Sequence, residues 1–346
     1  MTALYARYMD RWERKLATRD TNRVVRPFEW GTDWLNSLNS PTARPTPTET
    51  PRNAFPASSP RRWQTPTVFS PISRYATTGW RKIDSTFTSP VSTRYPENNT
   101  AHALWFPVPD DKGRVVIVLP QWNSGPDGHV GLAKLLNRCG ISALRMTMAY
   151  HAERKPAETQ RADYHVSSNV GRTIHAGQAI GSGCARLRGL AGGQQGYSRI
   201  GVLGTSLGSC VAFMAAAHDP RIRMGIFNHV SMHFADVVWT GLSTQNVSKA
   251  FAGHVTQEEL RRYWSVISPA SYLKRFQKRD LKTLLIWASH DSTFLPVYSR
   301  QVLDSFRELD LPHKVFNLPC GHYTTGQFPL TSWMASPCAA SRLRNL

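Results

Sequence analysis

One serine of this sequence stands in a setting that favours nucleophilic chemistry. The pattern G-x-S-x-G occurs at Gly204-Thr-Ser206-Leu-Gly208, between an apolar run that starts at Arg199 and an alanine-rich segment. The two glycines permit the tight, strained turn from strand to helix that exposes a serine oxygen at the edge of a sheet. The pentapeptide alone is common by chance, so its place between a strand and a helix carries the prediction. Ser206 is therefore predicted to be a nucleophile.

The elements that must position Ser206 begin near residue 80. Short apolar runs alternate there with helix-length amphipathic segments, a pattern typical of strands joined by helical crossovers into a mostly parallel sheet. A capping box at Thr256 to Glu259 and a proline at 269 mark two helix starts. We predict strands over 81–88, 101–107, 114–120, 141–147, 198–204, 223–228, 282–288 and 313–318, and helices over 128–138, 167–190, 207–218, 257–266, 269–277 and 296–308.

The first 79 residues have a different composition. A helix is expected over about 3–18 and a short second helix over 32–38, and eight prolines follow between residues 41 and 71. Each proline removes a backbone donor and fixes φ, which excludes a long helix or a central strand. Interspersed aromatic residues favour an arm that packs on the main domain together with the helix before it. We therefore divide the chain into an N-terminal helix with a proline-rich arm, 1–79, and a main domain, 80–346.

The elbow and the strand pattern together resemble the α/β-hydrolase superfamily, over residues from about 80 to 330. The resemblance implies an α/β fold with a mostly parallel eight-stranded sheet flanked by helices, and a triad in the order serine, acid, histidine, with the acid and the histidine each following a late strand. Asp291 follows the run that ends near Trp287, and His322 follows the last predicted strand. Ser206, Asp291 and His322 are thus the predicted catalytic residues. Asp236, after the sixth strand, is the alternative acid.

The resemblance also implies an oxyanion hole made of two backbone amides. Leu207, directly after the nucleophile, supplies the first. The loop after strand 114–120 supplies the second, at Trp122 by its offset or at Gln121, although this loop has Pro-Gln where many members of the family have His-Gly. Gln121 is also a candidate substrate contact.

Residues 229–281 are too long for a simple crossover helix. In this superfamily such insertions form caps over the nucleophile, so 229–281 is predicted to be a helical cap. Trp239 and Trp264 within it are candidate substrate-binding residues, although aromatic residues at helical spacing are more often part of the core.

Composition excludes several other classes. The net charge is +19, but the basic residues are spread along the chain rather than gathered in an arm or stripe, so no nucleic-acid partner is expected. No apolar run is long enough to span a membrane. The five cysteines form no C-x-x-C pair and the histidines no set at ligand spacing, so neither a disulfide framework nor a metal site is predicted. The absence of a signal-like start predicts a cytoplasmic protein.

The sequence thus predicts a serine hydrolase, a carboxylesterase that needs no cofactor and no metal and takes a small-molecule ester as substrate. A peptidase, a lipase or thioesterase, and a carbon–carbon hydrolase of the same fold remain alternatives. So does a binding protein that keeps the hydrolase fold without turnover. The oligomeric state is left open.

Overall fold

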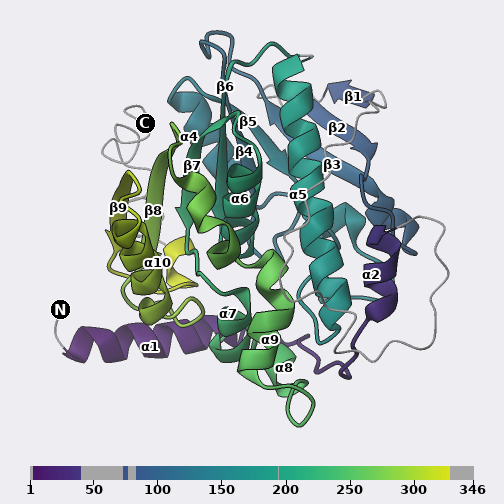
Figure 1. The fold of residues 1–346 in the computed structure, drawn as a ribbon, viewed down its shortest axis with the longest axis vertical. Coiled ribbons are helices and arrows are strands. Elements are labelled where there is room, and N and C mark those ends of the chain that lie inside the picture. Colours follow the sequence, from purple (N-terminus) through teal and green to yellow (C-terminus); the bar gives the residue numbers. More distant parts are fainter. Residues whose placement is uncertain (1–2, 40–72, 77–82, 194, 328–346) are drawn as a thin grey trace.

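The computed structural model of the protein describes residues 3–39, 73–76, 83–193 and 195–327 (Figure 1). Within these ranges nine strands form one sheet in the order β1-β2-β3-β5-β4-β6-β7-β8-β9. The pairs β1–β2, β2–β3 and β3–β5 are antiparallel, and β5, β4, β6, β7, β8 and β9 run parallel. The strands are β1 Ser73–Ala76, β2 Ile83–Thr88, β3 Thr100–Phe106, β4 Arg114–Leu119, β5 Ser142–Met146, β6 Arg199–Thr205, β7 Ile222–Asn228, β8 Lys282–Ala288 and β9 His313–Leu318.

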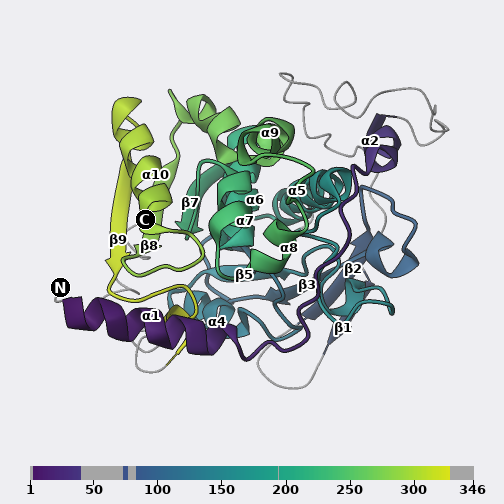
Figure 2. The ribbon, with the colours of Figure 1, turned by 90° about the horizontal axis from the view of Figure 1, so that it is seen from below.

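Helices cover both faces of the sheet, as the view from below shows (Figure 2). α5, α6 and α10 lie on one face and α1 and α4 on the other. The helices are α1 Ala3–Ala17, α2 Thr32–Asn39, α4 Val130–Arg138, α5 Val170–Gly193, α6 Leu207–His218, α7 Phe234–Thr240, α8 Gln245–Lys249, α9 Gln257–Tyr263 and α10 Pro296–Glu308.

Each face of the sheet has its own apolar core, because successive residues of a strand point to opposite faces. Along β4, Val115, Ile117 and Leu119 join the core under α5 and α6, while Val116 and Val118 join the core under α4. Met9 of α1 belongs to the second core. The near-continuous apolar runs of the central strands thus fill two layers at once.

The predicted α/β architecture with its mostly parallel sheet is confirmed. All eight predicted strands are present, with ends that differ by at most two residues, and β1 is an additional antiparallel edge strand. The segment predicted as a helix over 269–277 is the 3-10 helix η4, Pro269–Phe276. The capping box forms as expected, with Thr256 and Glu259 each bonded to the other's backbone. The proline-rich stretch 41–71 and Cys338 lie outside the described residues.

Two further sequence expectations can be compared with the fold. The predicted N-terminal helix is α1, and it packs through Met9 on the sheet face that it shares with α4. Within the described ranges, no helix is both long enough and apolar enough to cross a bilayer.

Candidate active site

Ser206 lies at the turn between β6 and α6, in a strained backbone conformation with φ 56° and ψ −120°. A non-glycine residue with positive φ stores strain that the surrounding structure must hold. The flanking glycines make the turn possible, since a Cβ at Gly204 would lie 2.0 Å from the carbonyl oxygen of Gly208. A Cβ at Gly208 would lie 2.1 Å from the carbonyl oxygen of Leu119. The elbow therefore packs tightly against the end of β4 and presents Ser206 to a cavity.

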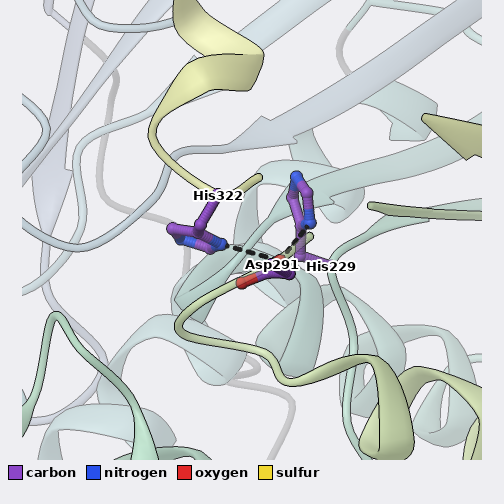
Figure 3. Close-up of side chains that lie close together, drawn as sticks. All are labelled: His229, Asp291 and His322. Atoms are coloured by element: carbon purple, nitrogen blue, oxygen red, sulfur yellow. Dashed lines mark hydrogen bonds and ion pairs between the residues drawn. The ribbon is translucent and has the colours of Figure 1, made fainter. Parts of the chain in front are cut away.

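Asp291 and His322 meet at the same edge of the sheet, in the loops that follow β8 and β9 (Figure 3). The Nδ1 atom of His322 lies 3.1 Å from Oδ2 of Asp291. Oδ1 of Asp291 accepts hydrogen bonds from the backbone amides of Thr293 at 2.8 Å and Phe294 at 2.7 Å. The carboxylate is therefore fixed by its own loop while its other oxygen faces the imidazole.

The charges of this pair shift both of its pKa values. Burial alone would raise the pKa of Asp291, but the neighbouring His322 and His229 outweigh burial and hold that pKa well below its ordinary value. Burial would lower the pKa of His322, but Asp291 and, more weakly, Glu13 outweigh it and raise that pKa above its ordinary value. Asp291 is thus an anion at neutral pH, as an acid that orients an imidazole must be.

A second histidine, which the sequence analysis did not single out, shares the same carboxylate. His229 directly follows β7 with φ 58°, and its Nδ1 lies 2.8 Å from Oδ2 of Asp291 (Figure 3). The rings of His229 and His322 are 4.8 Å apart between centroids. The one signal in the sequence that could have indicated His229 is its position directly after β7, a parallel strand next to the strand of the nucleophile.

These three side chains also form the one group, among the residues that the structure describes, with the composition and spacing to hold a metal ion. The ligand atoms of His229, Asp291 and His322 all lie within 4.8 Å of one another. The Nδ1 atom of His322 hydrogen-bonds to the carboxylate, an arrangement that also orients an imidazole for proton transfer.

The loop after β4 faces the elbow and is fixed by buried contacts. The amide of Asn123 donates to Nε2 of His151 at 2.9 Å, so it is already used. His151 is buried, and its Nδ1 lies 2.7 Å from the carbonyl oxygen of Ala149. Burial, followed by the nearby His165, holds the pKa of His151 well below its ordinary value, which leaves Nε2 free to accept. A role for His151 in fixing this loop was not predicted from the sequence.

One predicted oxyanion residue, Trp122, directly precedes Asn123, and the other, Leu207, directly follows Ser206. Gln121, Trp122 and Ser206 all line the cavity. The Trp122 side chain is held by a hydrogen bond from Nε1 to the carbonyl oxygen of Ala162 at 2.9 Å. No hydrogen bond of the described residues uses the amide of Leu207 or of Trp122, so both remain available to a bound oxygen.

The cavity measures about 1120 Å³ and brings together many of the predicted residues. Ser206, His322, Gln121 and Trp122 line it, and so does His229. From the predicted cap insertion, Ser243 and His229 are the described residues that reach it.

Three predicted candidates lie elsewhere. Trp264 is fully buried in the core, and its Nε1 donates a hydrogen bond to the carbonyl oxygen of Val170. Trp239 stacks on Phe251, with 6.3 Å between the ring centroids. Neither lines the cavity among the described residues, because the insertion packs its aromatic face against the core with α5 and α6. Asp236, the alternative acid, is instead bonded to Arg261 and Gln257 within the insertion.

The fold is similar to that of several solved structures over most of the chain. The acetyl xylan esterase 1 of Thermoanaerobacterium sp. JW/SL YS485 has a TM-score of 0.59 at 16% identity, covering 92% of this chain and 96% of its own. The acetyl xylan esterase of Paenibacillus sp. R4 has a TM-score of 0.58 at 14% identity, covering 93% and 96%. The acylaminoacyl peptidase of Pyrococcus horikoshii has a TM-score of 0.53 at 14% identity, covering 74% of this chain and 38% of its own. Identities this low establish the fold alone.

The sequence itself identifies the family. No curated protein matches the chain. A family model described as alpha/beta hydrolase domain containing 18 matches residues 74–279, a stretch that includes the elbow, the loop after β4 and His229. This match covers more than half of the chain, which therefore belongs to the alpha/beta hydrolase domain containing 18 family of the α/β-hydrolase superfamily.

Proposed function

We propose that the protein is a serine hydrolase that cleaves a carboxylic ester through an acyl-enzyme intermediate. The observation that carries the proposal is a shared cavity, which Ser206 and His322 both line while Asp291 holds His322 from behind by a hydrogen bond. Ser206 occupies the strained elbow after β6, and His322, which is hydrogen-bonded to Asp291, lines the same cavity. A serine that lines the same cavity as a carboxylate-bound imidazole is suited to activation of its hydroxyl for attack on a carbonyl.

Each residue has a defined part in the proposed reaction. Oγ of Ser206 attacks the ester carbonyl, and Nε2 of His322 takes its proton. Asp291 holds the imidazole through Nδ1 and stabilises its protonated form. His322 then returns the proton to the leaving alcohol, and the acyl group stays on Ser206. Water, deprotonated by the same imidazole, attacks the acyl-enzyme and releases the acid.

The oxygen that becomes negative in this reaction needs two aligned donors. The amides of Leu207 and Trp122 are free of other partners among the described residues. Trp122 lines the cavity, and Leu207 directly follows Ser206, which lines it too. Loss of one such donor typically costs about a hundredfold to a thousandfold in kcat. These two amides are the proposed oxyanion hole, and Gln121 is a proposed substrate contact.

Hydrolysis of p-nitrophenyl esters of increasing acyl length tests this proposal. The wild-type chain should turn over at least one ester, and Ser206→Ala should lower kcat by roughly 10⁴ or more, because triad residues act as a unit. Ser271→Ala is the matched control, since Ser271 is an exposed serine on η4 whose hydroxyl bonds only locally to Ser265. It should retain full activity.

The same assay separates the alternatives. Peptidyl p-nitroanilides test a peptidase, and acyl-CoA substrates test a thioesterase. A chelator should leave ester turnover unchanged, which addresses the metal-like cluster of His229, Asp291 and His322. Full activity of Ser206→Ala, or no turnover of any ester by the folded wild-type chain, would overturn the proposal.

A further inference from the structure

A carboxylate from the N-terminal helix lies directly beneath the loop that carries His322. Glu13 of α1 is fully buried. It accepts backbone hydrogen bonds from three successive residues, His322 at 2.9 Å, Tyr323 at 3.2 Å and Thr324 at 2.8 Å. These contacts join positions more than 300 residues apart in the sequence.

The same carboxylate also reaches the loop that carries the acid. Oε2 of Glu13 accepts a hydrogen bond from Oγ of Ser292 at 2.7 Å, and Ser292 directly follows Asp291. The approach is close, since a Cβ at Gly321 would lie 2.2 Å from Cδ of Glu13. Tyr5, which is nearer the start of α1, donates a hydrogen bond from its hydroxyl to the carbonyl oxygen of Pro319. α1 therefore contacts the loops after β8 and β9 together.

The burial of the Glu13 carboxylate has a cost in free energy. A buried carboxylate costs several kcal/mol unless hydrogen bonds or an opposite charge compensate it. In the part of the chain that the structure describes, Glu13 forms no ion pair with lysine or arginine. The hydrogen bonds from the loops after β8 and β9 therefore offset the cost of removing its carboxylate from water. An apolar residue at position 13 could pack in the same place without the desolvation cost of a buried carboxylate.

The chain that follows α1 reaches the other walls of the cavity. Arg23 donates to the hydroxyl of Tyr323 at 2.9 Å and to the carbonyl oxygen of Ser243 at 3.2 Å. Asp20 pairs with Arg161 at 2.9 Å, and the Arg161 guanidinium lies 5.5 Å from the centre of the Trp122 ring. Figure 1 shows α1 lying across the end of the molecule where α7 and α8 also lie.

We propose that residues 13–23 are a positioning segment of the active site, in which Glu13 holds the loop that carries His322 in place. The proposal rests on the proposed function, because it assumes that His322 is the general base. Glu13 acts through the backbone of the His322 loop and touches no substrate, so it is a positioning residue.

The charge of Glu13 gives the proposal a pH signature. The charged and titratable groups that face His322 are Asp291, Glu13, His229 and Tyr323, and Arg23 bonds to Tyr323. Asp291 and Glu13 both favour the protonated imidazole and raise the pKa of His322 against its burial. A neutral side chain at position 13 should therefore lower that pKa.

The experiment measures ester hydrolysis by Glu13→Gln across a range of pH. We expect kcat to fall by roughly tenfold to a hundredfold with little change in KM, because a displaced base impairs the chemical step more than binding. The acidic limb of kcat/KM should move to lower pH. A purely structural role would lower the melting temperature without moving this limb.

Asp10→Asn is the matched control. Asp10 is an exposed acid on the same helix that pairs with Arg14, so it should leave kcat and the pH profile unchanged. Should Glu13→Gln fail to fold, Ser292→Ala removes one donor and keeps the carboxylate, and a several-fold loss of kcat at an unchanged melting temperature is then the supporting result.

Two negative results are distinguishable. An active wild-type chain whose kcat and pH profile survive Glu13→Gln, or survive Ser292→Ala where the first variant does not fold, would overturn this inference alone. A folded wild-type chain without ester turnover would overturn the proposed function, and this inference with it.

Discussion

Asp291 is the residue on which the candidate site depends most. One of its oxygens is held by two amides of its own loop, and the other faces both His322 and His229. One carboxylate oxygen thus has two imidazoles within 3.1 Å. The geometry at this residue thus determines the protonation of the proposed base.

A pair of aspartates tests this assignment. Asp291→Asn should lower esterase kcat by at least roughly a hundredfold, because the amide no longer fixes the imidazole tautomer or stabilises its charge. The acidic limb of kcat/KM should also move down, since His322 must be neutral to act and Asp291 is what raises its pKa.

Asp236→Asn is the comparison in the same assay. Asp236 is bonded to Arg261 and Gln257 in the insertion, so its loss should affect stability while kcat stays near that of the wild type. The opposite ranking of the two variants would assign the acid to Asp236 in α7.

The candidate site residues differ in how well a sequence pattern can predict them. Ser206 could be predicted because the close approaches at Gly204 and Gly208 require glycine, and this requirement leaves a local pattern. Glu13 leaves none, since it is one acid among many charges on an amphipathic helix. His229 is likewise recognisable only once β7 and β8 are known to be neighbours.

At the scale of single elements, helix starts and strand ends follow local rules. α6 and α10 begin and end at the residues predicted from the sequence, because the elbow and Pro296 fix their first turns. η4 differs in type, as its backbone bonds close over three residues rather than four, and β1 depends on pairing with β2 rather than on its own composition. Pairing with a neighbouring strand, a tertiary contact, decides the case of β1.

The capping box of α9 offers a clean test at this scale. Thr256→Ala removes a side chain that accepts from the Glu259 amide at 3.2 Å, and should cost about 1 kcal/mol of unfolding free energy. Esterase activity should stay unchanged, because this exposed cap does not reach the cavity. Thr256→Ser keeps the hydroxyl and serves as the control in denaturant unfolding. Equal stability of the alanine variant and the wild type would show that the cap contributes nothing.

At the scale of the whole molecule, the N-terminal helix and the loops after β8 and β9 form one assembly. α1 covers the sheet face that it shares with α4, and its buried carboxylate holds the loops that carry Asp291 and His322. The parallel sheet could be predicted from alternating apolar and amphipathic segments. Docking of this N-terminal helix on the main domain is also expected from the sequence, but the face that it covers is not, because the strands of that face lie far from α1 in the sequence.

The central claim is that this whole arrangement activates Ser206, and covalent labelling of the intact chain tests it most directly. A fluorophosphonate reacts with an activated serine and forms a stable adduct whose position mass spectrometry can map. The account predicts one adduct on the folded wild-type chain, on the peptide that contains Ser206, and its loss in Ser206→Ala. No adduct on the folded chain, or an adduct that persists in Ser206→Ala, would contradict it.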